Sequence, residues 1–121
     1  MTFDAHIGMT REGDDPSRAM IVTGPEHLNP TGNINGGVLI SLADNLATGV
    51  ASRAYFEKTG EQAFLVGVDL HATMLANQHG GTIHAHAEPV RVGRRITVVR
   101  TSVKGDGGRL LAEVTTTHVP T

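Results

Sequence analysis

The stretch from Gly36 to about Tyr55, GGVLISLADNLATGVASRAY, constrains the fold most, because it is the one convincing helix in the chain. Its apolar residues recur at helical spacing and define a single buried face, made of Leu39, Leu42, Ala43, Leu46, Val50 and Ala54. The loop before it, residues 25–35, holds two prolines, three asparagines and a glycine. A long helix with one apolar face must pack on another layer, and the remaining segments have to supply it.

The other segments of the chain are predicted to be β-strands. Two short strands precede the loop and are separated by a GDDPS turn; we expect them at Ala5–Arg11 and Arg18–Gly24. Four longer strands follow the helix, at Ala63–Met74, Gly81–Val92, Arg94–Lys104 and Arg109–Val119. The last joint, GDGG, is a strong hairpin signal because glycine adopts positive φ freely. One helix followed by an antiparallel meander predicts an α+β fold, and the lack of internal repeats predicts one domain over residues 1–121.

Composition limits how such a fold is stabilised. Hydrophobic residues make up 39% of the chain but aromatic residues only 3%, so the core must consist of Val, Ile, Leu and Ala. A core without large rings gains less from burial per residue. Association of several copies buries further apolar surface, and the composition therefore favours an oligomer.

Charge, cysteine content and hydropathy exclude several classes of protein. The net charge of −2 argues against a nucleic-acid binder, which normally carries a basic excess. The chain has no cysteine, which excludes disulfides, thiolate metal sites and a cysteine nucleophile. It begins without a signal-peptide pattern and contains no apolar run near the roughly 20 residues that span a bilayer. We therefore expect a soluble cytoplasmic protein.

A second stripe on the predicted helix carries polar and small residues, namely Gly37, Ser41, Asp44, Thr48 and Ser52. A solvated face on so long a helix usually carries Lys, Glu or Arg, but here Asp44 is the only charged residue before Arg53. Small residues permit close approach by another chain or a ligand. We interpret the stripe as the wall of a site rather than a solvent face.

The start of the predicted helix forms a second candidate. The first N–H groups of a helix have no intrahelical acceptor, and together with the helix dipole they favour an anion or a polarised carbonyl oxygen. Gly36 and Gly37 stand at this position, and Asn35 before them is a good helix cap. Asp44 is eight residues from Gly36, or roughly 12 Å along the helix axis. If both act on one carbonyl group, they must come from two copies of the chain.

Residues 29–48, NPTGNINGGVLISLADNLAT, resemble the hotdog-fold acyl-CoA thioesterases, most closely the phenylacetate-pathway (PaaI-like) and 4-hydroxybenzoyl-CoA thioesterase branch. The later segments GRRITVVR and DGGRLLAEV resemble the last two strands of that family. The resemblance implies a long helix wrapped by a curved antiparallel sheet, the hotdog fold. It also implies homodimers, often paired into tetramers, with the site between subunits and without a metal or redox cofactor.

The same resemblance assigns roles to individual residues. Asp44 matches the catalytic carboxylate, which acts as nucleophile or general base in different members. Gly36 matches the backbone donor to the thioester carbonyl, Asn29 a loop amide, and Thr48 a hydroxyl near the carboxylate or the attacking water. The family's histidine before the two glycines is Asn35 here, which can bond but cannot titrate. We expect Asn35 and Gly37 to contact the substrate.

Two features leave alternatives open. The basic residues Arg91, Arg94 and Arg95 are either part of solvated strands or a patch for the phosphates of CoA, which suit the forked donors of arginine. The exchange of histidine for Asn35 keeps open a non-catalytic hotdog module that binds acyl-CoA or another acyl ligand. The sequence does not identify the acyl group.

The histidines offer weaker candidates. His84 and His86 share one face of a strand and would suit a metal site, but no third ligand follows by spacing, so an exposed polar face is favoured. A hotdog dehydratase needs a histidine paired with an acid, and the only nearby histidine, His27, lies upstream in the loop. Ser41 lacks the G-x-S-x-G setting of a serine hydrolase.

Overall fold

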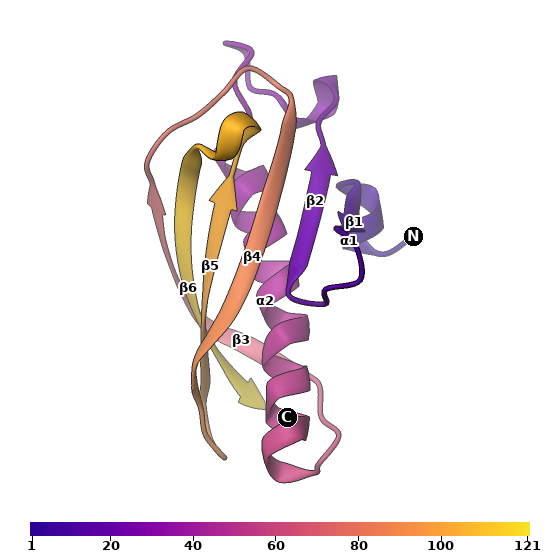
Figure 1. Cartoon of the computed structure of the whole chain (residues 1–121), viewed down its shortest axis with the longest axis vertical. Coiled ribbons are helices and arrows are strands. Elements are labelled where there is room, and N and C mark those ends of the chain that lie inside the picture. The colour runs from indigo at the N-terminus through magenta and orange to yellow at the C-terminus, as the bar shows by residue number, and fades with distance from the viewer.

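Helix α2 (Gly36–Thr59) is the central element of the computed structural model, which describes all 121 residues (Figure 1). The helix begins where it was predicted to begin but runs four residues beyond Tyr55. It ends only at Gly60, which adopts φ 76 and donates its N–H to the carbonyl oxygen of Phe56. The residues between Tyr55 and Gly60 are compatible with a helix, so the first left-handed glycine sets the end.

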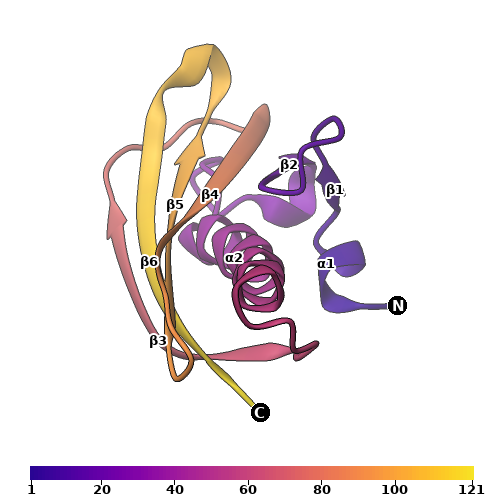
Figure 2. The same ribbon diagram turned by 60° about the horizontal axis from the view of Figure 1, so that its bottom comes forward.

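The sheet has six strands, all of them antiparallel to their neighbours, in the order β1-β2-β4-β5-β6-β3. Their bounds are β1 (Met9–Arg11), β2 (Arg18–Val22), β3 (Leu65–Met74), β4 (Thr82–Val92), β5 (Thr97–Lys104) and β6 (Leu110–Pro120). Figure 2, which looks nearly along α2, shows the sheet curving around the helix. The predicted α+β architecture of one long helix wrapped by a curved antiparallel sheet is confirmed.

The predicted meander is right for β4, β5 and β6 but wrong for β3. Strand β3 pairs with β6 at the far edge of the sheet instead of with β4, its successor in the chain. The connection between them, residues 75–81, crosses over the end of the sheet, and the N–H groups of Leu75 and Ala76 bond to the carbonyl oxygen of Leu111. Alternation along a strand says which side faces inward, but it does not say which strand lies alongside.

The prediction for the N-terminal segment is also partly wrong. The short helix α1 (Phe3–His6) takes up the first two residues of the strand expected at Ala5–Arg11, and β1 begins only at Met9. Gly8, with φ 78, makes the break between the two. Strand β2 ends at Val22, two residues earlier than expected, and a 3₁₀ turn, η1 (Pro25–His27), follows in the loop.

The core lies between α2 and the concave face of the sheet. The helix buries five of the six predicted residues and in addition Ala47, Ala51 and Tyr55, whereas Ala54 is only half-buried. The buried face is wider than one stripe because the sheet wraps around the helix. On β4 the side chains alternate as predicted: Ile83, Ala85 and Ala87 are buried, and His84 and His86 lie on the outer face.

A polar group of side chains interrupts this apolar core. Thr97 and Thr101 of β5 and Thr116 and His118 of β6 point inward and are fully buried or nearly so. Two of the threonine hydroxyl groups and Nδ1 of His118 have no hydrogen-bond partner. Such groups are rare in protein cores, and one of them lies beside the candidate site described below.

None of the helices combines the length and the hydropathy that crossing a bilayer requires.

Candidate functional site

Asp44 projects from the middle of α2 toward the edge strand β3. It is half-buried, and none of the ion pairs of the chain involves it. It lies close to Gly67 of β3, because a Cβ atom at that position would lie 3.7 Å from Oδ1 of Asp44. The carboxylate therefore faces the backbone of β3 and lies without a cation beside it, at an edge of the sheet that no other strand covers.

The hydroxyl groups of the small-residue stripe turn back onto the helix. Thr48 Oγ1 donates to the carbonyl oxygen of Asp44 at 3.0 Å, so in this chain it contacts the backbone of Asp44 rather than its carboxylate. Ser52 Oγ donates to the carbonyl oxygen of Thr48 and accepts the N–H of Leu65 at 3.0 Å. The second bond fixes the start of β3 against α2 and so helps to place Gly67 beside Asp44.

The start of α2 has the cap that the sequence predicted. Asn35 has extended backbone angles, and its side-chain oxygen accepts the N–H of Gly37 at 2.8 Å. The N–H of Gly36 donates to no group of the chain. A Cβ atom on Gly36 would lie 3.3 Å from Cε of Met74, at the end of β3. A free donor at the positive end of the helix dipole is thus held beside that strand.

Asn29 shapes the loop that leads into this helix start. Its side-chain oxygen accepts from the N–H and hydroxyl of Thr31, at 2.9 and 2.7 Å, and from the N–H of Asn33 at 3.1 Å. The loop is fixed to the rest of the molecule at Ile34, whose carbonyl oxygen accepts from Asn77 at 2.8 Å. The oxygen of Asn29 is occupied by these bonds, and the residue acts on the site by setting the position of the helix start.

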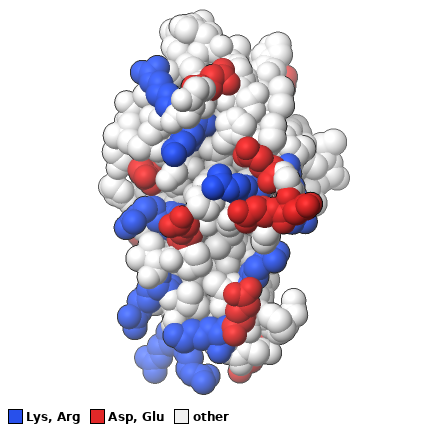
Figure 3. All heavy atoms as spheres, in the orientation of Figure 1, with Lys and Arg blue, Asp and Glu red and all other residues white.

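The predicted arginines lie far from the other candidates within one chain. Arg91, Arg94 and Arg95 are exposed at the β4–β5 hairpin, which Lys58 joins to the end of α2 through a 2.7 Å bond to the carbonyl oxygen of Val92. Lys58 is fourteen residues beyond Asp44, or about 21 Å along the helix. Figure 3 shows Lys and Arg side chains gathered at this lower end of the molecule.

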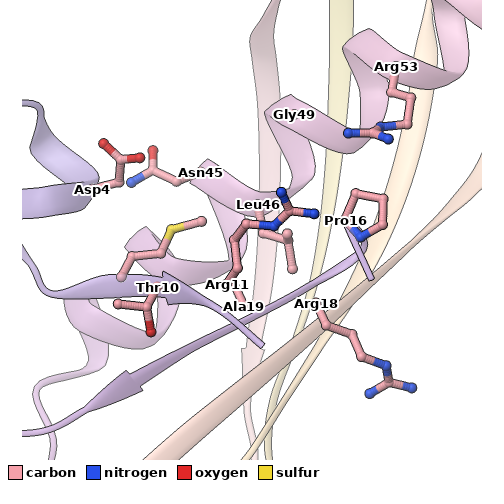
Figure 4. A pocket seen from close by; sticks show the side chains of 11 residues that line it. Asp4, Thr10, Arg11, Pro16, Arg18, Ala19, Asn45, Leu46, Gly49 and Arg53 are labelled. Carbon is pink, nitrogen blue, oxygen red and sulfur yellow. The ribbon is translucent and has the colours of Figure 1, made fainter. Parts of the chain in front are cut away.

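Two other arginines face a hollow that the sequence did not indicate. Figure 4 shows Arg11 of β1 and Arg53 of α2 directed into it, with Asp4 and Asn45 at its other end and Arg18 pointing away. The hollow has a volume of about 290 Å³. Spacing could not have paired these side chains, because they are 42 residues apart and meet only after the sheet has folded over the helix.

The two buried histidines differ in how their rings are bonded. His27 accepts the N–H of Gly24 at Nδ1, 2.9 Å away, and its Nε2 lies 2.7 Å from the carbonyl oxygen of Ile7. Both nitrogens are used to tie the loop to the N-terminal segment, which leaves none for a dehydratase. His118 has only one bond, from Nε2 to the hydroxyl of Thr116 at 2.8 Å. Burial lowers the pKa of His118, and the opposing effect of the Asp44 charge is smaller.

Sequence reasoning missed His118. The available signal was strand alternation, since Ala112, Val114 and Thr116 share its face of β6 and are buried.

Comparison with known proteins identifies the family. Residues 31–112, which include Gly36 and Asp44, match the family model described as the thioesterase superfamily. The chain belongs to the thioesterase superfamily. Membership supports hydrolysis of thioesters as its general chemistry, and it agrees with the resemblance found in the sequence.

Relatives of this thioesterase-superfamily chain extend over most of its length. It is 30% identical over 112 residues to "Putative esterase Rv1847" of Mycobacterium tuberculosis, an alignment that covers 91% of this chain and 79% of that protein. The solved structure of that esterase has a TM-score of 0.89 at 23% identity and covers 98% of this chain and 95% of that one.

Two further solved structures share the fold. Thioesterase HI1161 from Haemophilus influenzae has a TM-score of 0.86 at 23% identity, covering 96% of this chain and 80% of that one. The BH2602 protein from Bacillus halodurans, solved with CoA, has a TM-score of 0.83 at 21% identity, covering 96% of this chain and 73% of that one. At these identities the likeness shows the fold alone, and it confirms the predicted hotdog architecture.

Proposed function

We propose that the protein hydrolyses an acyl-CoA thioester to the free acid and CoA, at a site that two copies of the chain form together. The single observation that carries the proposal is the placement of two groups along one free strand edge. The carboxylate of Asp44 lies at Gly67, near the start of β3, and Gly36, whose N–H is free, lies at Met74, at its end.

The exposed edge of β3 favours pairing with a second copy. An uncovered strand of ten residues offers a row of unpaired backbone groups and is normally protected. Here it also carries large apolar side chains in water, with Val68 59%, Leu70 40% and Met74 45% exposed. Phe64 and Leu75 at the two ends of the strand are exposed as well. Antiparallel pairing with the same strand of another copy would cover this surface and satisfy the edge.

One register of that pairing assembles the site. The irregularity of β3 between Gly67 and Asp69 adds one residue to that stretch. If the two-fold axis passes through His71, Gly67 therefore stands opposite Met74 of the partner subunit, and both face the helix. Gly36 of the partner subunit then comes to the carboxylate of Asp44, and the symmetry repeats this arrangement at a second site. Gly36 and Asp44 of one helix are roughly 12 Å apart and cannot act on one carbonyl group, but Gly36 of one copy and Asp44 of the other can.

The proposed chemistry uses both groups on one thioester carbonyl. The free N–H of Gly36 donates to the carbonyl oxygen as it gains negative charge, and the helix dipole adds to this stabilisation. Asp44 either attacks the carbonyl carbon or removes a proton from the attacking water. In both routes the carbon–sulfur bond breaks, the thiol of CoA leaves with a proton, and water supplies the new acid oxygen. Thr48 and Asn29 hold the carboxylate-bearing turn and the helix start in place.

The resemblance in the sequence and the CoA bound to the Bacillus halodurans relative support CoA as the carrier. Arg91, Arg94 and Arg95 are proposed contacts for its phosphates, and Asn35 and Gly37 for the acyl end. A non-catalytic module that binds acyl-CoA is the second candidate, and Asn35 in place of the family's histidine is the observation that favours it.

A panel of aromatic and aliphatic acyl-CoA thioesters tests the proposal. Thiol release is followed for the wild type and for Asp44→Asn, while the mass of the species in solution is measured by light scattering. We expect turnover of at least one thioester, and loss of turnover in the variant at unchanged mass. Tight CoA binding in calorimetry without turnover of any thioester would support the binding module instead.

A further inference from the structure

His118 carries the one imidazole nitrogen in the core that has no hydrogen-bond partner. The residue lies on the inner face of β6 and is 0% exposed, and its Nε2 is bonded to the hydroxyl of Thr116. Its Nδ1 is buried and unpaired. Since His27 in the same molecule bonds through both ring nitrogens, the unpaired nitrogen of His118 is not a general feature of its buried histidines.

The unpaired nitrogen faces the same point as the carboxylate of Asp44. Gly67 pairs with His118 across the β3–β6 ladder, and a Cβ atom on Gly67 would lie 3.9 Å from Nδ1 and 3.7 Å from Oδ1 of Asp44. Gly67 also borders a hollow of about 520 Å³ that Thr48 and Phe64 help to line. The space beyond that point, with two polar neighbours and a path to solvent, suits one bound water molecule.

We propose that His118 is a positioning residue for Asp44, whose Nδ1–H donates through one water over Gly67 to Oδ1 of the carboxylate. The other carboxylate oxygen is then directed to the thioester or to the attacking water. This inference rests on the proposed role of Asp44. The Thr116 hydroxyl donates to Nε2 in this arrangement, which places the ring proton on Nδ1, where the negative charge of Asp44 favours it.

Charged groups around the pair agree with this assignment. Asp44 is the charge that acts on His118, whereas burial keeps the ring neutral by lowering its pKa. Asp4 of α1 lines the far side of the hollow, and Asp69 is exposed farther along β3. On β5 the residue opposite His118 is Thr97, which is uncharged. Its hydroxyl is also buried and unpaired, and is therefore the competing partner for Nδ1.

The decisive variant is Gly67→Ala. The new methyl group would make ordinary contacts with both side chains, and Gly67 is not among the glycines with positive φ, so the chain should fold. The methyl group would nevertheless take up part of the space in which the proposed water lies. His118→Leu removes the donor, whereas His118→Asn keeps a donor near the place of Nδ1. Thr97→Val removes the competing hydroxyl and is the control.

The first readout is the pH profile of kcat/KM for thioester hydrolysis. A donor to Oδ1 stabilises the ionised carboxylate, so its removal should move the acid limb of the profile to higher pH. Because the bond is made to a charged group, we expect a shift of about one pH unit and a loss of about tenfold in kcat. Gly67→Ala and His118→Leu should show both effects, His118→Asn should restore most of the rate, and Thr97→Val should match the wild type.

The second readout does not depend on activity. Nitrogen-15 NMR of labelled histidine reports which ring nitrogen carries the proton, and His118→Asn identifies the signal. We expect the Nδ1–H form in the wild type, and Asp44→Asn and Gly67→Ala should both change its shift. If no thioester is hydrolysed, the NMR result still shows whether His118 is coupled to Asp44. An Nε2–H form, or a signal that responds to Thr97→Val but not to Gly67→Ala, would overturn the inference.

Discussion

Replacing Gly36 by proline would delete one N–H from the site with little change to the helix that carries it. Gly36 is the first residue of α2, where proline is favoured because its missing N–H has no intrahelical acceptor. Asn35 has φ −61 and ψ 131, which suits a residue that precedes proline. The only close contact of a Cβ atom there is Met74 Cε at 3.3 Å, the end of a flexible side chain. Gly36→Ala makes the same contact but keeps the N–H, and so is the matched control.

The expected loss of activity follows from the proposed role of the Gly36 N–H. Removing one preorganised donor to a developing oxyanion lowers kcat by about 10²- to 10³-fold, which corresponds to about 3–4 kcal/mol of barrier. We expect Gly36→Pro to lose activity on this scale and Gly36→Ala to retain most of it. Thiol release at saturating acyl-CoA measures the rate, and thermal unfolding shows that both variants are folded.

Mixing two inactive variants then asks whether the site lies between subunits. In a dimer of one Gly36→Pro chain and one Asp44→Asn chain, the intact Gly36 and the intact Asp44 meet at one of the two sites. Random exchange makes about half of the dimers mixed, so about a quarter of the wild-type activity should return. Differently tagged chains verify that subunits have exchanged. If activity then fails to recover, or if Gly36→Ala loses as much activity as Gly36→Pro, the reasoning is refuted.

Three further predictions follow from other parts of the structure. Leu70→Lys places a charge at the centre of the β3 edge and should give an inactive monomer in light scattering, whereas Val90→Lys, on exposed β4, should keep the wild-type mass and activity. Asn35→Ala removes the cap of α2 and should lower the free energy of unfolding in urea by about 1 kcal/mol, while Asn35→Ser should keep most of it. The pKa of His118 is lowered by burial from 6.5, so the unfolded chain binds that proton more readily. The contribution of the neutral, buried His118 to the free energy of unfolding should therefore be fully present above pH 6.5 and fall as the pH decreases toward the folded pKa. His118→Asn should remove this contribution to the pH dependence of the free energy of unfolding, measured by urea titrations at several pH values.

Features set by neighbouring residues were predictable from the sequence. The start of α2 is fixed by Asn35 and the two glycines, which act within one turn of helix, and the structure has the cap at that place. The alternation along β4 depends only on the strand period and placed His84 and His86 on the outer face. The first part of the strand expected at Ala5–Arg11 was wrong because Gly8 ends α1 with a left-handed turn, and a short segment of this kind carries no pattern that separates a helical turn from a strand.

Features set by contacts across the sheet were not predictable. Strand β3 was expected beside β4, but it lies beside β6, and nothing in its side chains specifies the neighbour. This pairing brings Gly67 next to His118. Because the pairing was not predicted, the proximity of His118 to the candidate site was not predicted either. The alternation applied to β4 would have turned His118 inward on β6, but only the register across β3 shows that its ring meets Asp44.

The position of β3 also explains why Asp44 can remain unpaired by any cation of its own chain. The crossover places β3 at the edge of the sheet and leaves one of its sides uncovered. Helix α2 beneath this edge presents the carboxylate of Asp44 near the start of β3 and the free N–H of Gly36 near its end. Edge placement exposes them, and antiparallel self-pairing is the symmetric operation that brings opposite ends of the same strand together. The helix spacing and the sheet order therefore support the proposed two-copy site independently.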